Sequence, residues 1–168
     1  SVPIAAVGLA LSGSMEDVFD LRLVGLALIV NACVLFAAER VGRGREREVR
    51  LKDAIIIGIF QAVAIIPGIS RSGTTISGGI FRGLQREMAA TFAFLLSVPA
   101  LLGAFAFGVV ELERYDADPV ALAAGALVAF AVGILSIDAL LKAVRGGKLW
   151  VFGAYCVVVG LLAVAYTL

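Results

Sequence analysis

The sequence predicts an all-α, polytopic integral membrane protein with a re-entrant helix-turn-helix hairpin. Of the 168 residues, 61% are hydrophobic and only 16% are charged, and the mean hydropathy is +1.05. Ordinary soluble domains are about 45 to 50% apolar and about 25% charged. Several apolar runs are long enough to cross a bilayer, and one shorter apolar stretch is interrupted by a turn rich in glycine and serine. These observations together indicate a chain that folds within a membrane.

The composition also excludes several other classes of protein. The chain is too apolar to be disordered, and 14 Lys and Arg against 13 Asp and Glu give a net charge of only +1, so no nucleic-acid partner is expected. The two cysteines, Cys33 and Cys156, are far apart in apolar runs, which excludes a disulfide scaffold. There is no histidine, so an imidazole base, phosphate acceptor or metal ligand would have to come from elsewhere.

We expect residues 1–168 to form a single transmembrane domain. Transmembrane helices are predicted at residues 21–38, 88–110, 119–141 and 149–168. Each reaches or approaches the ~20 residues that cross a ~30 Å hydrocarbon core. At ~1.5 Å per residue, the apolar stretch 1–11 would cover only about half of this thickness. We therefore interpret residues 1–11 as the end of a truncated transmembrane helix, and the chain as a fragment of a longer protein.

Residues 53–86 have a different pattern, which predicts the re-entrant hairpin. An apolar arm at 54–66 and a mildly apolar arm at 76–84 flank a polar turn. Neither arm is long enough to cross the membrane alone. By length, the segment could be a single broken helix that crosses, or a hairpin that returns to the side from which it came.

The distribution of loop charges favours the hairpin. Most of the basic residues lie in the segments 39–52, 82–86 and 142–148, whereas the turns 12–20 and 111–118 are acidic. If residues 53–86 re-enter, all three basic segments lie on one face of the membrane and both acidic turns on the other, as the positive-inside tendency requires. We therefore expect a multi-pass protein of the cell (inner, cytoplasmic) membrane, with its basic face in the cytoplasm.

The turn at residues 67–75, PGISRSGTT, has the highest density of polar groups within the apolar part of the chain. Irregular backbone at membrane depth is tolerated where it is buried in protein or lines a wet cavity. Gly68 and Gly73 permit conformations and close approaches that a side chain would prevent. We expect Thr74 or Thr75 to cap the outgoing helix, whose positive N-terminal end would then face the same space and favour a phosphate.

Arg71 adds a permanent positive charge with a forked geometry that suits two phosphate oxygens. The turn could instead be a packing device in which Arg71 neutralises an acid. However, the acid that we can place at membrane depth is Asp138, near the end of its span, so a purely structural pairing with Arg71 is not obvious. Ionisable residues at this depth are functional candidates by default. We predict a diphosphate-binding site made of Gly68, Ser70, Arg71, Ser72, Gly73, Thr74 and Thr75.

Smaller features predict packing. Asn31 is expected to join helices through hydrogen bonds, and Asp138 to pair with Lys142 one turn later. Asp53 is expected to cap the incoming helix, or else to hold a cation. Three glycines are expected to allow helices to pack closely: Gly25, Gly125 and Gly133.

The run from Gln61 to Ile76, QAVAIIPGISRSGTTI, resembles the undecaprenyl-diphosphate phosphatase family, also called the bacitracin-resistance protein family. The resemblance is dense over residues 52–104 and continues through Gly83-Leu84, Arg86-Glu87, FAFLL at 92–96 and Pro99. It implies a membrane hydrolase, built from inverted repeats, that removes the terminal phosphate of a C55 polyprenyl diphosphate. The product is the monophosphate carrier that cell-wall synthesis reuses.

The resemblance also implies roles for residues. Arg71 would bind the diphosphate and stabilise charge in the transition state, while Ser70, Ser72 and Thr75 would add hydrogen bonds. A divalent cation, Mg or Ca, is implied, but neither its ligands nor the nucleophile can be identified in this chain. The glutamate-rich segment and the serine-histidine element of the family's earlier repeat are absent from this sequence. We therefore expect a missing N-terminal repeat or a second chain to complete the site, and the oligomeric state stays open.

Two alternatives from other classes stay open as well. A transporter or flippase for polyprenyl phosphate or another anion would also aim the N-terminus of a broken helix at its substrate. A non-catalytic membrane subunit could bind the diphosphate without hydrolysing it.

Overall fold

A computed structural model describes residues 20–41, 44–112 and 118–167. In this part of the chain the named elements are all α-helices: α2 (Leu21–Arg40), α3 (Leu51–Val63), α4 (Arg71–Phe81), α5 (Arg86–Leu112), α6 (Pro119–Arg145) and α7 (Leu149–Tyr166). Four of them, α2, α5, α6 and α7, are long and apolar enough to cross a membrane, which confirms the all-α, polytopic fold class. The predicted span at 1–11 lies outside the described residues.

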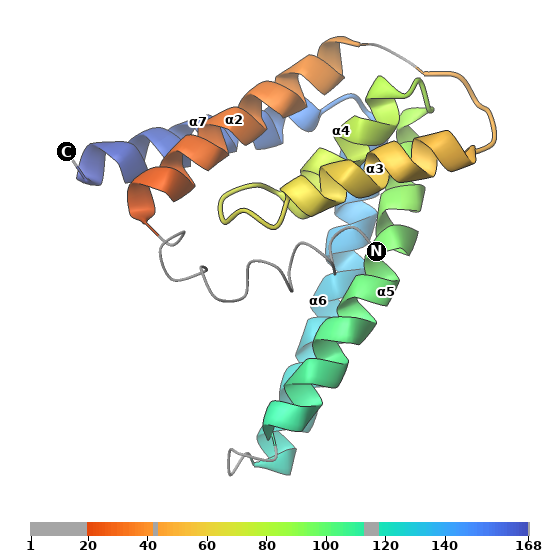
Figure 1. The fold of residues 1–168 in the computed structure, drawn as a ribbon. Helices are drawn as coiled ribbons and strands as arrows, with labels where there is room; N and C mark the ends of the chain where they lie inside the picture. The colour runs from red at the N-terminus through yellow and green to blue at the C-terminus, as the bar shows by residue number, and fades with distance from the viewer. Residues whose placement is uncertain (1–19, 42–43, 113–117, 168) are drawn as a thin grey trace.

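Helices α2 and α7 pack side by side and run in opposite directions (Figure 1). Their backbones approach closely at two glycines, because a Cβ atom on Gly25 would lie 2.9 Å from the carbonyl oxygen of Gly160. Close to this contact, the buried Asn31 amide donates a hydrogen bond of 3.4 Å to the Sγ atom of Cys156. The predictions that Gly25 allows close packing and that Asn31 joins helices are therefore confirmed.

Helices α3 and α4 form a hairpin that packs against α2 and α5. Small residues bring α4 close to both neighbours. A Cβ atom on Gly78 would lie 3.0 Å from the ring of Phe60 in α3, and one on Gly79 would lie 2.7 Å from the Cβ of Ala89 in α5. In the turn, Gly68 has a φ of 94°, which strongly favours glycine. The tip of the hairpin therefore lies against the first turns of α2, where a Cβ on Gly68 would meet the backbone oxygen of Val24.

The buried core lies around α4, in which all residues from Thr74 to Ile80 are buried. Helices α2, α3 and α5 surround it, together with the adjoining ends of α6 and α7. The core cluster consists of Ala32, Leu35, Ala38, Ile57, Ile76, Ile80, Leu84, Ala89, Ala90, Ala93, Val144, Leu149 and Cys156. The helix that carries the predicted site is thus held from several sides.

Asp53 ties the two ends of the hairpin together. Its carboxylate is fully buried and accepts hydrogen bonds from Arg47 Nη1 at 2.6 Å and from Arg82 Nε at 2.9 Å. It also accepts from the backbone N–H of Arg50 at 3.1 Å. Arg50 is the N-cap of α3 and Asp53 is its third residue, so Asp53 takes part in capping through a capping box and is not the N-cap itself. The hydrogen bond from Arg47, followed by those from Arg50 and Arg82, holds the pKa of Asp53 well below its usual range, although burial acts in the opposite direction.

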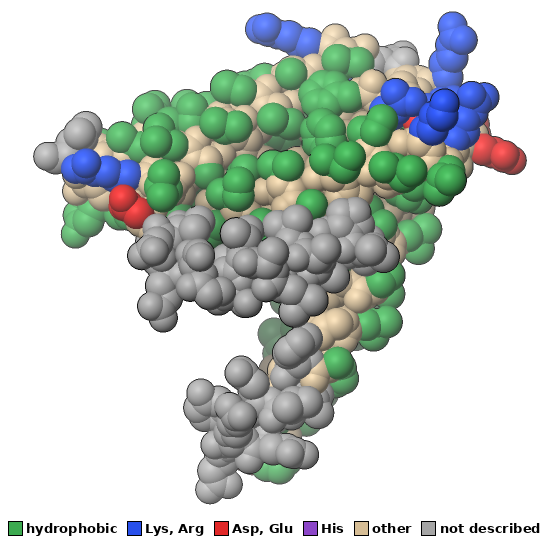
Figure 2. All heavy atoms as spheres, viewed as in Figure 1, with side chains coloured by type: hydrophobic (Ala, Val, Ile, Leu, Met, Phe, Trp, Pro, Cys, Tyr) green, Lys and Arg blue, Asp and Glu red, His purple; other side chains and the backbone are tan. Residues whose placement is uncertain are grey.

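The three basic segments meet at one end of the molecule. Glu39 at the end of α2 accepts a hydrogen bond from Arg86 Nη1 at 2.6 Å and another from the backbone N–H of Leu149 at 3.0 Å. A further ion pair, of 2.5 Å, joins Arg145 at the end of α6 to Glu87. In Figure 2, most of the visible Lys and Arg side chains lie around this end of the molecule. The placement of this end in the cytoplasm, and the re-entry of the hairpin into a membrane, stay predictions.

Helices α5 and α6 form a long hairpin that leans away from the rest of the molecule (Figure 1). At Gly125 and Gly133, an added Cβ atom would have no neighbour within 4 Å. The prediction that these two glycines allow close packing is therefore wrong for this structure, because no described helix packs against them. Asp138 does bind Lys142 at 2.7 Å, as predicted from their spacing.

Candidate functional site

Three helices meet around a cavity of about 430 Å³, which we call the polar cavity because Arg71 and several neutral polar residues are among those that line it. On α4 and α5 the lining residues recur at the spacing of about one helical turn, which places them on one face of each helix. Helix α3 contributes Gln61 from its last turn, the start of α4 contributes Arg71, Ser72 and Thr75, and α5 contributes Ala93, Phe94 and Ser97. The turn between α3 and α4 supplies residues 64–69. Arg71 and part of the predicted turn therefore line this cavity.

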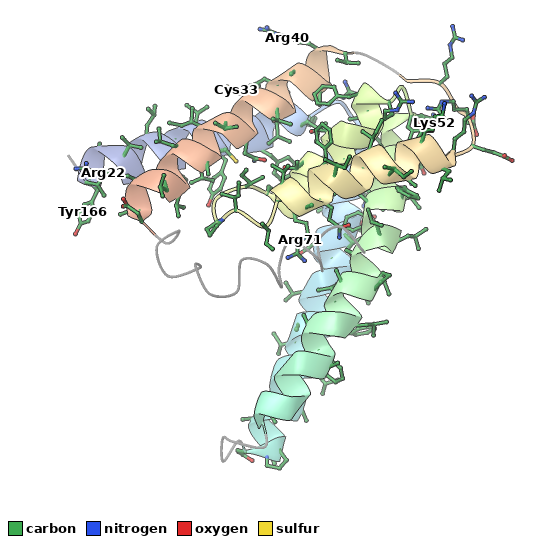
Figure 3. The ribbon with its side chains drawn as sticks, in the orientation of Figure 1. Arg22, Cys33, Arg40, Lys52, Arg71 and Tyr166 are labelled. Carbon is green, nitrogen blue, oxygen red and sulfur yellow. The ribbon has the colours of Figure 1, made fainter. Side chains whose placement is uncertain are left out.

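Arg71 is the first residue of α4, and its side chain is exposed. Figure 3 shows it extending away from α2 and far from Arg40 and Lys52, which lie at the basic end. Among the described residues no acid pairs with Arg71, and Asp138 is engaged by Lys142 instead. The alternative that Arg71 neutralises Asp138 is therefore not found in this structure, and its guanidinium is available to an anion.

The N-terminus of α4 adds backbone donors beside Arg71. Ser70 is the N-cap, with its Oγ atom accepting from the N–H of Gly73 at 3.2 Å. Within the described part of the chain, the N–H groups of Arg71 and Ser72 have no acceptor. Such free groups at a helix start attract anions. The prediction that Thr74 or Thr75 caps this helix is wrong, because the helix begins earlier and both threonines lie inside it.

The two threonines have separate roles. Thr75 lines the polar cavity, and its hydroxyl donates to the carbonyl oxygen of Arg71 at 2.8 Å. Thr74 is buried and donates to Asn31 Oδ1 at 3.2 Å, facing a different cavity of about 150 Å³. Thr74 therefore joins α4 to α2 and lies outside the cavity that contains Arg71, which corrects its place in the predicted site.

A second, mainly apolar cavity of about 710 Å³ lies on the other side of the turn. It is lined by apolar side chains from four helices: Leu28, Leu35, Ile76, Leu140, Leu149 and Phe152. Ser70 and Gly73 face this cavity, while Gly68, Ile69 and Ser72 line both cavities. The predicted residues thus form a wall between a polar and an apolar space, a division that the sequence pattern did not indicate.

The polar cavity does not fit a divalent cation by its described residues alone. It is lined by an amide, hydroxyl groups and a guanidinium, and no carboxylate lines it. Mg²⁺ and Ca²⁺ prefer carboxylate and carbonyl oxygens. Across residues 20–41, 44–112 and 118–167, no group of three or more His, Cys, Asp or Glu residues could hold a metal ion.

Sequence reasoning missed Gln61 and Ser97 as cavity residues. Gln61 is almost fully buried on α3, and Ser97 on α5 donates to the carbonyl oxygen of Phe94 at 2.6 Å. Gln61 is a single polar residue in the otherwise apolar arm 54–66. That contrast was the available signal, since a polar residue in such an arm needs a partner or a cavity.

Comparison with known proteins shows the family of the chain. Residues 1–162 match the family described as Bacitracin resistance protein BacA. A relative from Methanosphaera stadtmanae named undecaprenyl-diphosphatase is 38% identical, over 98% of this chain and 60% of its own length. Relatives with the same name from Desulforapulum autotrophicum and Moorella thermoacetica are each 41% identical, over 98% of this chain and over 61% and 64% of their own lengths.

The match is continuous over most of the chain but covers only part of these relatives. The chain spans about three fifths of the length of the curated relatives that it matches. The family match includes the whole of the polar turn, all the residues that line the polar cavity, and both arms of the hairpin. The chain belongs to the bacitracin resistance protein BacA family.

Proposed function

We propose that the chain is the diphosphate-binding part of a membrane phosphatase that hydrolyses undecaprenyl (polyprenyl) diphosphate to the monophosphate. This reaction would return the lipid carrier to cell-wall synthesis. The observation that carries the proposal is Arg71, which has no acidic partner in the described structure and lies beside free N–H groups in a polar cavity. Family membership and the name undecaprenyl-diphosphatase of its relatives support the choice of substrate.

The diphosphate would bind at the first turn of α4. The guanidinium of Arg71 can donate two parallel hydrogen bonds to oxygens of one phosphate. The N–H groups of Arg71 and Ser72 point along the positive end of the helix, and the exposed Ser72 hydroxyl adds another donor. These groups belong to a hairpin that is tied at its base by Asp53, so binding would require little ordering of the backbone.

Hydrolysis would proceed by attack of water on the terminal phosphorus atom. The bond from that phosphorus to the bridging oxygen breaks, the bridging oxygen leaves on the lipid monophosphate, and the proton of the water passes to a base. Negative charge develops on the leaving oxygen, and donors already in place stabilise it without reorganisation. Arg71 is the residue that we assign to this role, with Ser70, Ser72 and Thr75 as secondary polar groups.

The base and the cation require other residues. The chain has no histidine, and no carboxylate lines the described polar cavity. We propose that a further repeat or a second chain supplies the base together with the ligands of a divalent cation, Mg or Ca. The described residues of the polar cavity alone do not fit such a cation.

The lipid part of the substrate would follow the apolar side of the turn. The cavity of about 710 Å³ between α2, α4, α6 and α7 offers apolar side chains to the first isoprene units. The rest of the tail would stay among the lipid chains of the cell membrane, with the basic end of the protein in the cytoplasm.

Binding of farnesyl diphosphate to the detergent-solubilised chain tests this proposal. Arg71→Ala should weaken binding about 10- to 100-fold, since a hydrogen bond to a charged group contributes about 1.5–3 kcal/mol. Arg71→Lys should restore only part of this loss, because Lys cannot form the fork. Arg40→Ala is the matched control, since Arg40 is also exposed but lies at the basic end.

Phosphate release separates a phosphatase from the two alternatives. We expect phosphate release when the chain is assembled with the part of its relatives that it does not cover. We expect this release to be lost in Arg71→Ala. Transfer of intact lipid diphosphate across vesicles without release would indicate a transporter. Tight binding without either activity would indicate a binding subunit, and wild-type release in Arg71→Ala would remove Arg71 from the site.

A further inference from the structure

We infer that Gln61 is a further substrate-contacting residue, which binds the diphosphate from the α3 side of the polar cavity. This inference rests on the proposed function and adds a residue to the same site. It starts from an unsatisfied polar group rather than from the motif around Arg71, so the two can be tested separately.

Gln61 is buried without a complete set of partners. Its side chain is 1% exposed, and its Oε1 atom has no hydrogen-bond donor. Buried polar groups are nearly always paired, and an unpaired one destabilises the fold. A methionine of similar length would fill the same space without this penalty. The glutamine is therefore better explained by a ligand than by packing.

The other buried polar side chains have different explanations. Asn31 and Thr74 bind each other, Thr75 binds the carbonyl oxygen of Arg71, and Asp53 binds two arginines. Ser77 Oγ also lacks a partner, but Ser77 lines none of the cavities described above. Gln61 is distinguished because it is both unsatisfied and part of the wall of the cavity that holds Arg71.

The position of Gln61 suits a contact with phosphate. Gln61 lines the cavity from the last turn of α3, and Ala64 and Ile65 line it from the start of the turn that follows. Arg71, Ser72 and Thr75 line it from α4. A diphosphate held at the start of α4 would therefore lie between the two arms of the hairpin, with Gln61 on the arm that has no charged residue facing the cavity.

A carboxamide provides the chemistry that this position needs. It has two N–H donors and one acceptor, and rotation of the terminal amide exchanges their directions. In the bound state, rotation of the amide would place Nε2 where the unpaired Oε1 now lies, so that one of its N–H groups donates to a non-bridging phosphate oxygen. Because the amide is neutral, it adds a hydrogen bond without competing with the diphosphate for Arg71, as a carboxylate would.

The test combines binding with stability for variants of the detergent-solubilised chain. Gln61→Met keeps the size of the side chain and removes its polar groups. We expect Gln61→Met to bind farnesyl diphosphate about tenfold more weakly, while its Tm is unchanged or rises by about 2–4 °C. Gln61→Glu should bind more weakly still, because it places a negative charge beside the phosphates. Gln85→Met, at an exposed glutamine of the basic end, should leave binding unchanged.

Each other outcome overturns the inference. Unchanged binding in Gln61→Met, alongside weaker binding in Arg71→Ala, would exclude Gln61 and leave the proposed function intact. Unchanged binding in both variants would overturn both proposals. A fall in Tm that accompanies weaker binding in Gln61→Met would assign Gln61 a structural role, since an unpaired amide that only binds ligand should not stabilise the free protein.

Discussion

The α2–α7 pair and helix α6 are similarly apolar, yet they pack very differently. Part of each helix of the pair is buried, whereas none of the central stretch of α6 is buried in this structure, although α6 is at least as apolar. The pair has close glycine contacts and a buried asparagine, and the corresponding glycines of α6 have no neighbours. Apolar character keeps a helix in a bilayer, but small residues and buried polar groups bring helices together.

The largest expected difference between the two regions comes from placing a bulky side chain at a glycine that contacts another helix and at one that does not. At Gly160, a Cβ atom would lie 2.8 Å from the backbone oxygen of Gly25, so Gly160→Leu should destabilise the fold by about 3 kcal/mol, the upper part of the range for overpacking. Gly133→Leu meets open space and should change stability by less than about 0.5 kcal/mol. Thermal unfolding in detergent compares the two, and equal losses would contradict the distinction.

Asp53 should give a smaller, pH-dependent effect in the packed region. Its pKa is lowered in the folded protein, chiefly by the hydrogen bond from Arg47. The carboxylate therefore stabilises the fold above its unfolded pKa of about 3.9, and this stabilisation is lost as the pH falls toward the folded pKa. Asp53→Asn should lose about 1–2 kcal/mol at neutral pH.

The pH profile of Asp53→Asn provides the check. Unfolding temperatures of the wild type should fall more steeply than those of Asp53→Asn below about pH 4. Glu46→Gln, which removes an exposed carboxylate, should keep the wild-type profile. If Asp53→Asn keeps the full acid dependence of the wild type, the Asp53 cluster does not cause it.

The ion pair between Asp138 and Lys142 should give the smallest effect. Both side chains are more than half exposed, at 61% and 72%, and exposed pairs contribute about 0–1 kcal/mol. Asp138→Asn should therefore change the unfolding free energy by less than about 0.5 kcal/mol. A loss as large as that of Asp53→Asn would show that α6 is packed in solution in a way that this structure lacks.

The sequence predicted those features that depend on local pattern. Apolar length located the four long helices, and the polar turn located Arg71 and the break between α3 and α4. Asn31 and Gly25 were also interpreted correctly, because a polar or small residue within a span has few other uses. The cap of α4 was assigned to the wrong residue, since it depends on where the helix begins, and Ser70 precedes that point.

The remaining features depend on contacts between residues that are distant in the sequence. Arg82 meets Asp53 at the base of the hairpin, 29 residues away in the sequence, and no spacing rule connects them. The same holds for the separation of the predicted site into two cavities, which requires the positions of α5, α6 and α7 around the turn. Gly125 and Gly133 resemble Gly25 in sequence, and the presence of a neighbouring helix decides their role.

Glu39 fixes the start of α5. Its carboxylate binds Arg86, the first residue of α5, and the first N–H of α7, so this end of α5 acts as a pivot. A helix of 27 residues is about 40 Å long, and a tilt of roughly 6° about Glu39 would carry its far end by about 4 Å. Ser97 lies only about 16 Å along the helix, so the same tilt would move it by less than about 2 Å. A tilt about this end would therefore displace the far end of α5 more than the wall beside Arg71.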